Sequence, residues 1–157
     1  MDKLPMTREG LQALEDELKR LKSVDRPAVI QAIAEARAHG DLSENAEYDA
    51  ARDKQGFIEG RIAELEAAIS LAEVIDTSAM AGDTVRFGAW VVLADEDTGK
   101  EVTYRIVGQH EADLEKGKIS VTSPLARALI GKSAEDSVEV AAPGGSKAYE
   151  ICEILYK

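Results

Sequence analysis

Four carboxylates gather in one short stretch of the sequence, which reads RAHGDLSENAEYDAAR from position 37 to position 52. They are Asp41, Glu44, Glu47 and Asp49, and no lysine or arginine separates them. Carboxylate oxygens are ligands that Mg²⁺ prefers, and this ion is often held by only one or two protein carboxylates together with water and substrate phosphates. The stretch is therefore a candidate for part of a magnesium site that groups from outside the chain complete.

Asp41 and Glu44 have the spacing that suits this chemistry best, because residues three apart lie on neighbouring faces of a helical turn. The same spacing has a simpler interpretation. If a helix begins at Leu42, Asp41 is its N-cap and Glu44 its third residue, and the two form a capping box. Negative charge there stabilises a helix by about 0.3 to 1 kcal/mol. By themselves the residues favour capping, although capping does not explain Glu47 and Asp49.

Two arginines and one tyrosine accompany the carboxylates. Arg37 and Arg52 flank the stretch, where each can contact a phosphate locally or form a surface salt bridge, for example with Glu35 or Asp49. Tyr48 can stack on a base, but it is also the first residue of an apolar seam. We predict that Tyr48 packs in the helical core.

Composition limits the possible functions. The 157 residues carry a formal net charge of -11, which excludes a protein that holds nucleic acid by broad neutralisation of phosphates. The one cysteine, Cys152, excludes an internal disulfide and lies in the apolar run ICEIL, where we predict that it is buried. No apolar run has the length of a membrane span, and the first residues lack a secretory signal. We expect a cytoplasmic monomer.

A first helical pattern precedes the acidic stretch. Thr7 is its predicted cap. Apolar residues then recur three and four positions apart, at Leu11, Leu14, Leu18 and Leu21. Pro27 predicts a break or kink between Val24 and Arg26, because proline disfavours helical conformation in the residue before it. The pattern continues through Ile30, Ile33, Ala34 and Arg37. Gly40 ends it as a left-handed residue.

A second helical pattern follows the acidic stretch and is more regular. Its seam alternates steps of three and four over Tyr48, Ala51, Gln55, Ile58, Ile62, Leu65, Ile69 and Ala72. Two seams of similar length joined by a short turn predict an antiparallel coiled-coil hairpin over residues 1–76, with the acidic stretch at its turn.

The apolar period changes to two beyond a polar linker, residues 76–83. The alternating segments contain Val85 and Phe87, Trp90 and Val92, Val102 to Ile106, Ile119 and Val121, Val138 and Val140, and Tyr149 to Tyr156. Gly99 suits the turn of a hairpin loop at residues 95–100. A short helix has Ser123 as its cap, Pro124 in first position and Gly131 at its end. Residues 80–157 therefore predict a small antiparallel sheet with one short helix, and the fold class is α+β.

Four segments carry a resemblance to a known family: GDLSENAEYDAAR, GFIEGRIAELE, SPLARALIGK and the turn PGG. They resemble the bacterial Gre-type transcript cleavage factors, and the similarity extends over the whole chain. The resemblance implies an N-terminal coiled coil and an FKBP-like C-terminal domain. It also implies a partner, bacterial RNA polymerase, whose secondary channel the coiled coil enters while the globular domain stays at the rim. The implied function is to stimulate the polymerase's own cleavage of backtracked RNA 3′ ends.

The resemblance further implies roles for particular residues. Asp41 and Glu44 match the pair that helps to hold a Mg²⁺ ion in the polymerase active centre, so the chain has no cofactor of its own and is not itself an enzyme. Arg37 and Arg52 match basic positions near the nascent RNA 3′ end. The polymerase docking surface is implied at Ser123, Pro124, Ala126 and Arg127.

Three alternatives stay open at this point. One is a regulator or inhibitor that binds the same channel without stimulating cleavage. Another is an FKBP-like prolyl isomerase, although the sparse aromatic residues make an aromatic-lined pocket doubtful. The third is a coiled-coil holdase, which predicts an apolar turn in place of an acidic one.

Overall fold

The structure, a computed structural model, describes residues 3–38, 45–77, 80–141 and 143–156. It divides into two compact units, one formed by Leu11–Leu71 and the other by Met1–Gly10 with Ala72–Lys157. We call them the helical unit and the globular unit. The predicted domains, 1–76 and 80–157, stay a prediction, because the two units are defined by packing and not by independent folding.

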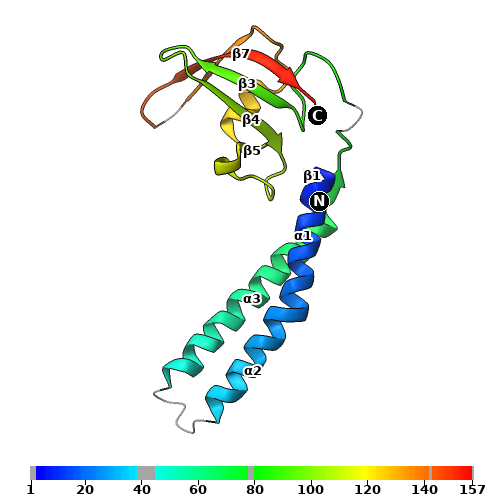
Figure 1. Cartoon of the computed structure of the whole chain (residues 1–157), viewed down its shortest axis with the longest axis vertical. Helices are drawn as coiled ribbons and strands as arrows, with labels where there is room; N and C mark the ends of the chain where they lie inside the picture. Colours follow the sequence, from blue (N-terminus) through cyan, green and yellow to red (C-terminus); the bar gives the residue numbers. More distant parts are fainter. Residues whose placement is uncertain (1–2, 39–44, 78–79, 142, 157) are drawn as a thin grey trace. The chain divides into compact units, whose positions relative to one another are not determined.

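The helical unit is an antiparallel hairpin, as predicted. Its first arm consists of α1 (Arg8–Arg20), η1 (Leu21–Asp25) and α2 (Arg26–Arg37), and its second arm is α3 (Ala46–Ser70). Figure 1 shows α2 and α3 lying side by side. The 25 residues of α3 span about 37 Å at 1.5 Å per residue.

The first arm is not broken before Pro27. Residues Leu21–Asp25 instead form a π-helical turn, in which the Arg26 backbone N–H donates to the Leu21 carbonyl. The Ser23 hydroxyl donates to the Lys19 carbonyl at 2.7 Å, as side chains do where a helical ladder is disturbed. Proline at the start of α2 has no N–H to place, so the wider turn accommodates it and the helix continues.

The π turn shifts the apolar seam by one residue. Leu14 and Leu21 are buried seven residues apart, but the next buried residue is Val29, eight positions on. A π turn contains one more residue than an α turn, so the residues that face the other arm after it come one position later in the sequence. The predicted seam after Pro27 was therefore wrong at Ile30, which is 52% exposed, and at Ala34 and Arg37, which are also exposed.

The seam of α3 has no such interruption and matches the prediction over most of its length. Its buried members are Ala51, Ile58, Ile62 and Leu65, followed by Ala68 near the C-terminal end. Because the helix is regular for 25 residues, the phase set by one apolar residue holds for the next.

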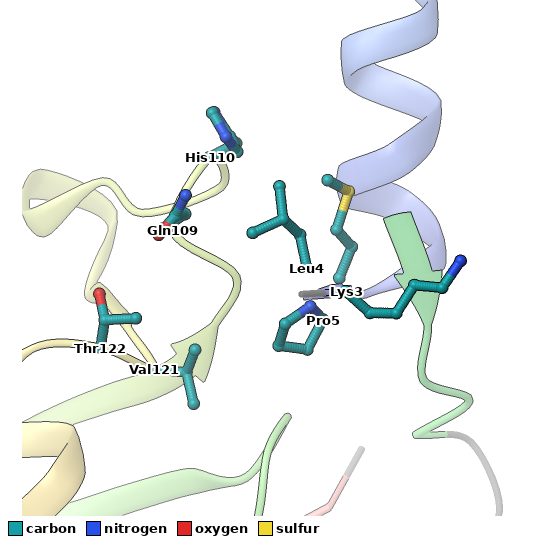
Figure 2. Close-up of a pocket in the computed structure, with 8 residues that line it drawn as sticks. Lys3, Leu4, Pro5, Gln109, His110, Val121 and Thr122 are labelled. Carbon is teal, nitrogen blue, oxygen red and sulfur yellow. The ribbon is translucent and has the colours of Figure 1, made fainter. Parts of the chain in front are cut away.

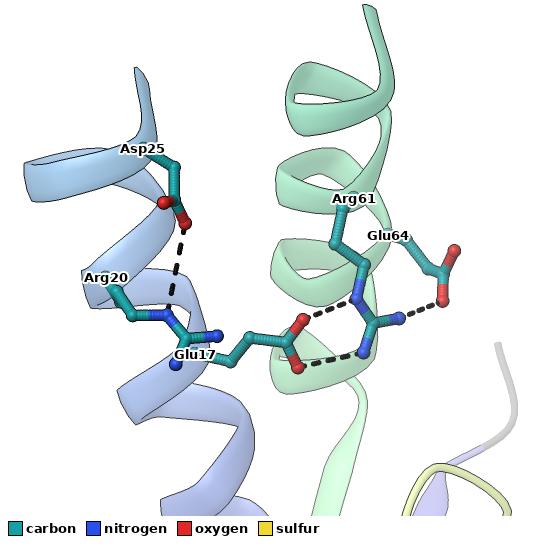
Figure 3. Close-up of polar contacts among 5 residues, drawn as sticks. All are labelled: Glu17, Arg20, Asp25, Arg61 and Glu64. Atoms are coloured by element: carbon teal, nitrogen blue, oxygen red, sulfur yellow. Dashed lines mark hydrogen bonds and ion pairs between the residues drawn. The ribbon is translucent and has the colours of Figure 1, made fainter. Parts of the chain in front are cut away.

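A bidentate ion pair joins the two arms. The Arg61 guanidinium donates to both carboxylate oxygens of Glu17, with Nε to Oε2 at 2.7 Å and Nη2 to Oε1 at 2.9 Å, and also to Glu64. Figure 3 shows Glu17 of α1 and Arg61 of α3 facing each other between the helices. Both side chains are about 30% exposed, so the pair is only partly screened by water.

This pair predicts a pH-dependent stability. Hydrogen bonds from Arg61 hold the pKa of Glu17 below its ordinary value. Because the folded pKa lies below the unfolded one, the stabilisation is fully present above the unfolded pKa and is lost as the pH falls through the folded pKa. We expect Glu17→Gln to lower the free energy of unfolding by about 1 kcal/mol at neutral pH, with the difference vanishing in acid.

The measurement is urea unfolding followed by circular dichroism at neutral and at acid pH. Glu15→Gln changes an exposed glutamate of the same helix and serves as the control. A Glu17→Gln difference that persisted unchanged in acid would contradict the assignment of the stabilisation to this ion pair.

The globular unit contains a five-stranded sheet. Its strands are β3 (Trp90–Asp95), β4 (Glu101–Val107), β5 (Lys118–Ser120), β6 (Ser137–Val140) and β7 (Lys147–Leu155). They lie in the order β5-β4-β3-β7-β6, of which Figure 1 labels β5, β4, β3 and β7. Two short helices accompany them, η2 (Leu114–Lys116) and α4 (Pro124–Leu129). The predicted α+β class is confirmed, with an additional parallel pair, β1 (Leu4–Met6) with β2 (Ala72–Val74).

Three details of the sheet differ from the prediction. The pair β4–β5 is parallel, although the other pairs of this sheet are antiparallel. Val85 and Phe87 lie outside any strand, and beside them Thr84 forms only an isolated bridge with Ser133. Cys152 is exposed, because its neighbour Ile151 is completely buried and successive side chains of β7 point to opposite faces.

Thr7 caps α1 as predicted, and its own backbone is held by Glu111. The Gly10 N–H donates to the Thr7 hydroxyl at 3.0 Å. Glu111 accepts from the backbone N–H of Thr7 at 3.0 Å, from the Thr7 hydroxyl, and from the Gly108 N–H at 2.8 Å. We call Thr7, Gly108 and Glu111 the Glu111 clasp. It lies within the globular unit and holds the segment after β1 against the 108–111 turn.

Candidate functional site

The described part of the hairpin turn begins at Asn45, which is the N-cap of α3. Its backbone is extended and its side-chain Oδ1 accepts from the Tyr48 N–H at 3.1 Å. α3 therefore begins at Ala46 and not at Leu42, the start on which the capping interpretation of Asp41 depends. Asp41 and Glu44 themselves lie outside the described residues, so their predicted function in metal binding stays a prediction.

Asn45 also connects the two arms. Its side-chain Nδ2 donates to the Ala36 carbonyl at 2.7 Å, near the C-terminal end of α2, where backbone carbonyls lack the regular i+4 helical donor. One amide thus satisfies a backbone group of each helix. The sequence contained a signal for this cap, because asparagine is among the best N-cap residues and the acidic Glu47 and Asp49 fall in the first turn that follows.

Asn45→Ala is expected to lower the free energy of unfolding of the helical unit by about 1 to 2 kcal/mol, since it removes both the cap of α3 and the hydrogen bond to the Ala36 carbonyl. Thermal unfolding followed by circular dichroism measures the loss. Asn45→Asp is the matched variant: it keeps the acceptor for Tyr48 but has no donor for Ala36, so it should fall between the alanine variant and the original chain.

Three side chains meet where α2 and α3 approach the turn. The Cζ of Arg37 lies 5.8 Å from the centroid of the Tyr48 ring, and the Cζ of Arg52 lies 5.9 Å from it. Arg52 Nη1 also donates to the Tyr48 hydroxyl at 3.0 Å. We call Arg37, Tyr48 and Arg52 the arginine–tyrosine cluster. Its members come from both arms, and the ring is half-buried between them.

The cluster carries a net positive charge. Among the described residues, neither Arg37 nor Arg52 forms an ion pair with a carboxylate, so the salt bridges considered for them with Glu35 and Asp49 are not formed. Hydrogen bonds from Arg37 and Arg52 lower the pKa of the Tyr48 hydroxyl. That direction is the one expected for a phenol beside two cations.

A shallow groove adjoins the cluster. It has a volume of about 170 Å³ and is lined by Ile30, Ile33, Arg37, Arg52 and Gln55. Two guanidinium groups in a groove of mixed polarity can bind a phosphate, while a less polar group contacts the two isoleucines. The predicted contact of Arg37 and Arg52 with RNA stays a prediction, but both side chains are accessible for it.

The predicted docking residues lie at the start of α4. Ser123 is its N-cap as predicted, since its hydroxyl accepts from the Ala126 N–H at 3.2 Å. Pro124 and Arg127 are exposed. Ala126 is completely buried, so its side chain packs the helix on the core and cannot itself face a partner. The docking function of the remaining residues stays a prediction.

A pocket of about 240 Å³ lies in the globular unit beside β1 (Figure 2). Its lining consists of Lys3, Leu4, Pro5, Met6, Gln109, His110, Val121 and Thr122. None of these residues is a phenylalanine, tyrosine or tryptophan. The pocket therefore lacks the aromatic walls that an FKBP-like isomerase would need.

The residues that the structure describes contain no group of three or more His, Cys, Asp or Glu side chains that could hold a metal ion. Within the same residues, no helix is both long enough and apolar enough to cross a membrane.

Comparisons with known proteins cover nearly the whole chain. Residues 4–74 match the family described as transcription elongation factor, N-terminal, and residues 80–156 match transcription elongation factor, GreA/GreB, C-term. The chain is 65% identical over 156 residues to a transcription elongation factor GreA of Acidiphilium cryptum, covering 99% of each chain. The same figures hold for the factor of that name from Rhodospirillum rubrum. A crystal structure of Gfh1 from Thermus aquaticus is 25% identical, covering 98% of this chain and 99% of that one, with a TM-score of 0.45.

Proposed function

The chain belongs to the GreA/GreB family of transcription elongation factors, and from this premise we propose that it stimulates bacterial RNA polymerase to cleave backtracked RNA at its 3′ end. The observation that carries the proposal is the match over the full length: both family models occur in order, and relatives named as elongation factors are 65% identical over 99% of the chain. Cleavage would release an arrested complex for further elongation.

Asp41 and Glu44 supply carboxylate oxygens to the polymerase active centre in this proposal. Two carboxylates are an incomplete ligand set for Mg²⁺, which suits an ion held jointly with the polymerase and the RNA phosphate. When bound, such an ion lowers the pKa of a water and neutralises charge on the phosphate. The chain itself is then no enzyme, because the reaction belongs to the polymerase.

Arg37 and Arg52 hold the RNA near its 3′ end. Their charge is local in a chain whose net charge is -11, so they can bind one phosphate without giving the protein a general affinity for nucleic acid. Both side chains are exposed, which supports this function because each guanidinium can be reached by a phosphate.

RNA polymerase is the proposed partner. The hairpin enters its secondary channel as a monomer, and Ser123, Pro124 and Arg127 belong to the surface that docks at the rim. Pro124 and Arg127 are exposed, as a docking surface requires.

The test is RNA cleavage by a purified polymerase halted in a backtracked complex, with and without the protein. We expect shortening of the RNA from its 3′ end to accelerate with added protein and to require Mg²⁺. Binding to the polymerase without faster shortening would instead favour the channel-binding regulator.

A further inference from the structure

We propose that Tyr48 is a positioning residue, which holds Arg37 and Arg52 together as one phosphate-binding pair. This inference rests on the proposed function, because the phosphate belongs to the RNA whose cleavage is stimulated. It adds a residue to that function, since the sequence favours core packing over base stacking for Tyr48.

The geometry places one aromatic ring between cations of two different helices. Arg37 comes from the last turn of α2 and Arg52 from the second turn of α3, and their Cζ atoms lie at nearly equal distances, 5.8 and 5.9 Å, from the Tyr48 centroid. Both distances are within the range of a cation–π interaction. The hydroxyl adds a hydrogen bond with Arg52 at 3.0 Å. Tyr48 is thus the residue that both arginines share.

The position of the ring is itself fixed. The Tyr48 N–H donates to Asn45, and Asn45 donates to the Ala36 carbonyl, one residue before Arg37. The cap that starts α3 therefore ties the backbone of Tyr48 to the end of α2. A ring held in this way can orient two long side chains that would otherwise sample many rotamers.

The neutrality of the ring is the chemical reason for a tyrosine here. Elsewhere in the hairpin the cross-arm arginines pair with carboxylates: Arg26 donates to Glu59 at 2.7 and 2.8 Å, and Arg61 donates to Glu17. A carboxylate orients a guanidinium but cancels its charge. An aromatic face orients it without cancelling the charge, so a bidentate contact with a phosphate remains possible.

The test compares Tyr48→Phe with Tyr48→Leu in the RNA cleavage assay. Phenylalanine keeps the ring, and we expect its maximal cleavage rate to stay within about twofold of the original. Leucine removes both cation–π interactions, and we expect a fall of about 5- to 10-fold in the maximal rate. The protein concentration that gives half of the maximal rate should change by less than about twofold, because docking on the polymerase does not involve Tyr48.

Combination with the arginine variants separates positioning from a structural effect. In a chain that carries Arg37→Gln and Arg52→Gln, Tyr48→Leu has no pair to position, so it should lower the rate no further. An equal loss in both backgrounds would overturn the inference, and so would a leucine variant as active as the original chain.

A readout without activity keeps this inference distinct from the proposed function. In NMR spectra of the free protein, the side-chain Nε–H signals of Arg37 and Arg52 should carry ring-current shifts that persist in Tyr48→Phe and disappear in Tyr48→Leu. If the original chain fails to stimulate cleavage, the proposed function is wrong. If it stimulates cleavage but neither signal responds to the loss of the ring, only the inference about Tyr48 is wrong.

Discussion

Replacing Asp41 and Glu44 together by alanine is expected to reduce stimulated RNA cleavage by at least about 100-fold, which is the scale observed when preorganised charge is removed from a reacting centre. Binding to the polymerase should stay within about twofold, because neither residue belongs to the proposed docking surface. Thermal unfolding should also change little, since the N-cap of α3 is Asn45, which the substitutions leave in place. The measurements are single-turnover cleavage at saturating protein, equilibrium binding, and circular dichroism.

Glu47→Ala with Asp49→Ala is the matched control for this prediction. It removes two negative charges, as many as the Asp41 and Glu44 variant does. Glu47 and Asp49 lie in the first turn of α3, where acidic residues stabilise a helix by about 0.3 to 1 kcal/mol each. We expect a modest loss of stability and cleavage within a few-fold of the original chain. If both pairs reduced cleavage equally, general negative charge would explain the effect and the assignment to Asp41 and Glu44 would be wrong.

Apolar periodicity predicted the elements that are regular over many residues. The α3 seam at Ala51, Ile58 and Leu65 followed from the sequence because nothing interrupts 25 residues of helix. The Ser123 cap followed for a similar reason, since a cap followed directly by proline is a local signal that needs no tertiary contact.

Predictions from the sequence differed from the structure where a contact between residues far apart in the chain decides which of two local structures forms. Pro27 predicted a disturbance, but the sequence could not distinguish a break from a π turn, which keeps Leu21 and Val29 buried. Asp41 and Asn45 are both good cap residues. Asn45 is the N-cap of α3, and its bond to the Ala36 carbonyl, nine positions away in the sequence, favours it in that position.

In the candidate functional site, too, some features followed from the local sequence and others depend on tertiary contacts. The residue types and spacing of the acidic stretch predicted the chemistry, but the partnership of Arg37 with Arg52 through Tyr48 emerges only when two helices lie side by side. Tyr48 was assigned to the core because its place in the heptad seam was the stronger local pattern. The functions of Asp41 and Glu44 are predicted from the family resemblance, and the cleavage assay of their alanine variant tests them.

Gly108→Ala is expected to destabilise the globular unit strongly, lowering its free energy of unfolding by about 3 kcal/mol. A Cβ at this position would lie 2.3 Å from the Pro5 carbonyl oxygen and 2.9 Å from Glu111 Oε2. The first atom belongs to the backbone of β1, so relief requires the strand to move. Movement would break the Glu111 clasp, including the bonds to Thr7.

Trp90 makes this measurement specific to the globular unit. It is the only tryptophan of the chain and lies in β3, so its fluorescence during urea unfolding reports the sheet and not the hairpin. Gly144→Ala is the control, because a Cβ there meets nothing within 4 Å, and we expect a change within about 0.5 kcal/mol.

Glu111→Gln tests the same clasp without introducing a new atom into the contact. It keeps the size of the side chain but weakens three hydrogen bonds by removing the charge of their acceptor, so a loss of about 1 to 2 kcal/mol is expected. This variant remains informative if Gly108→Ala does not fold. If both variants unfolded at the same urea concentration as Gly144→Ala, the segment around Thr7 would not be held against Gly108. The β1–β2 pair would then form without a contribution from the Glu111 clasp.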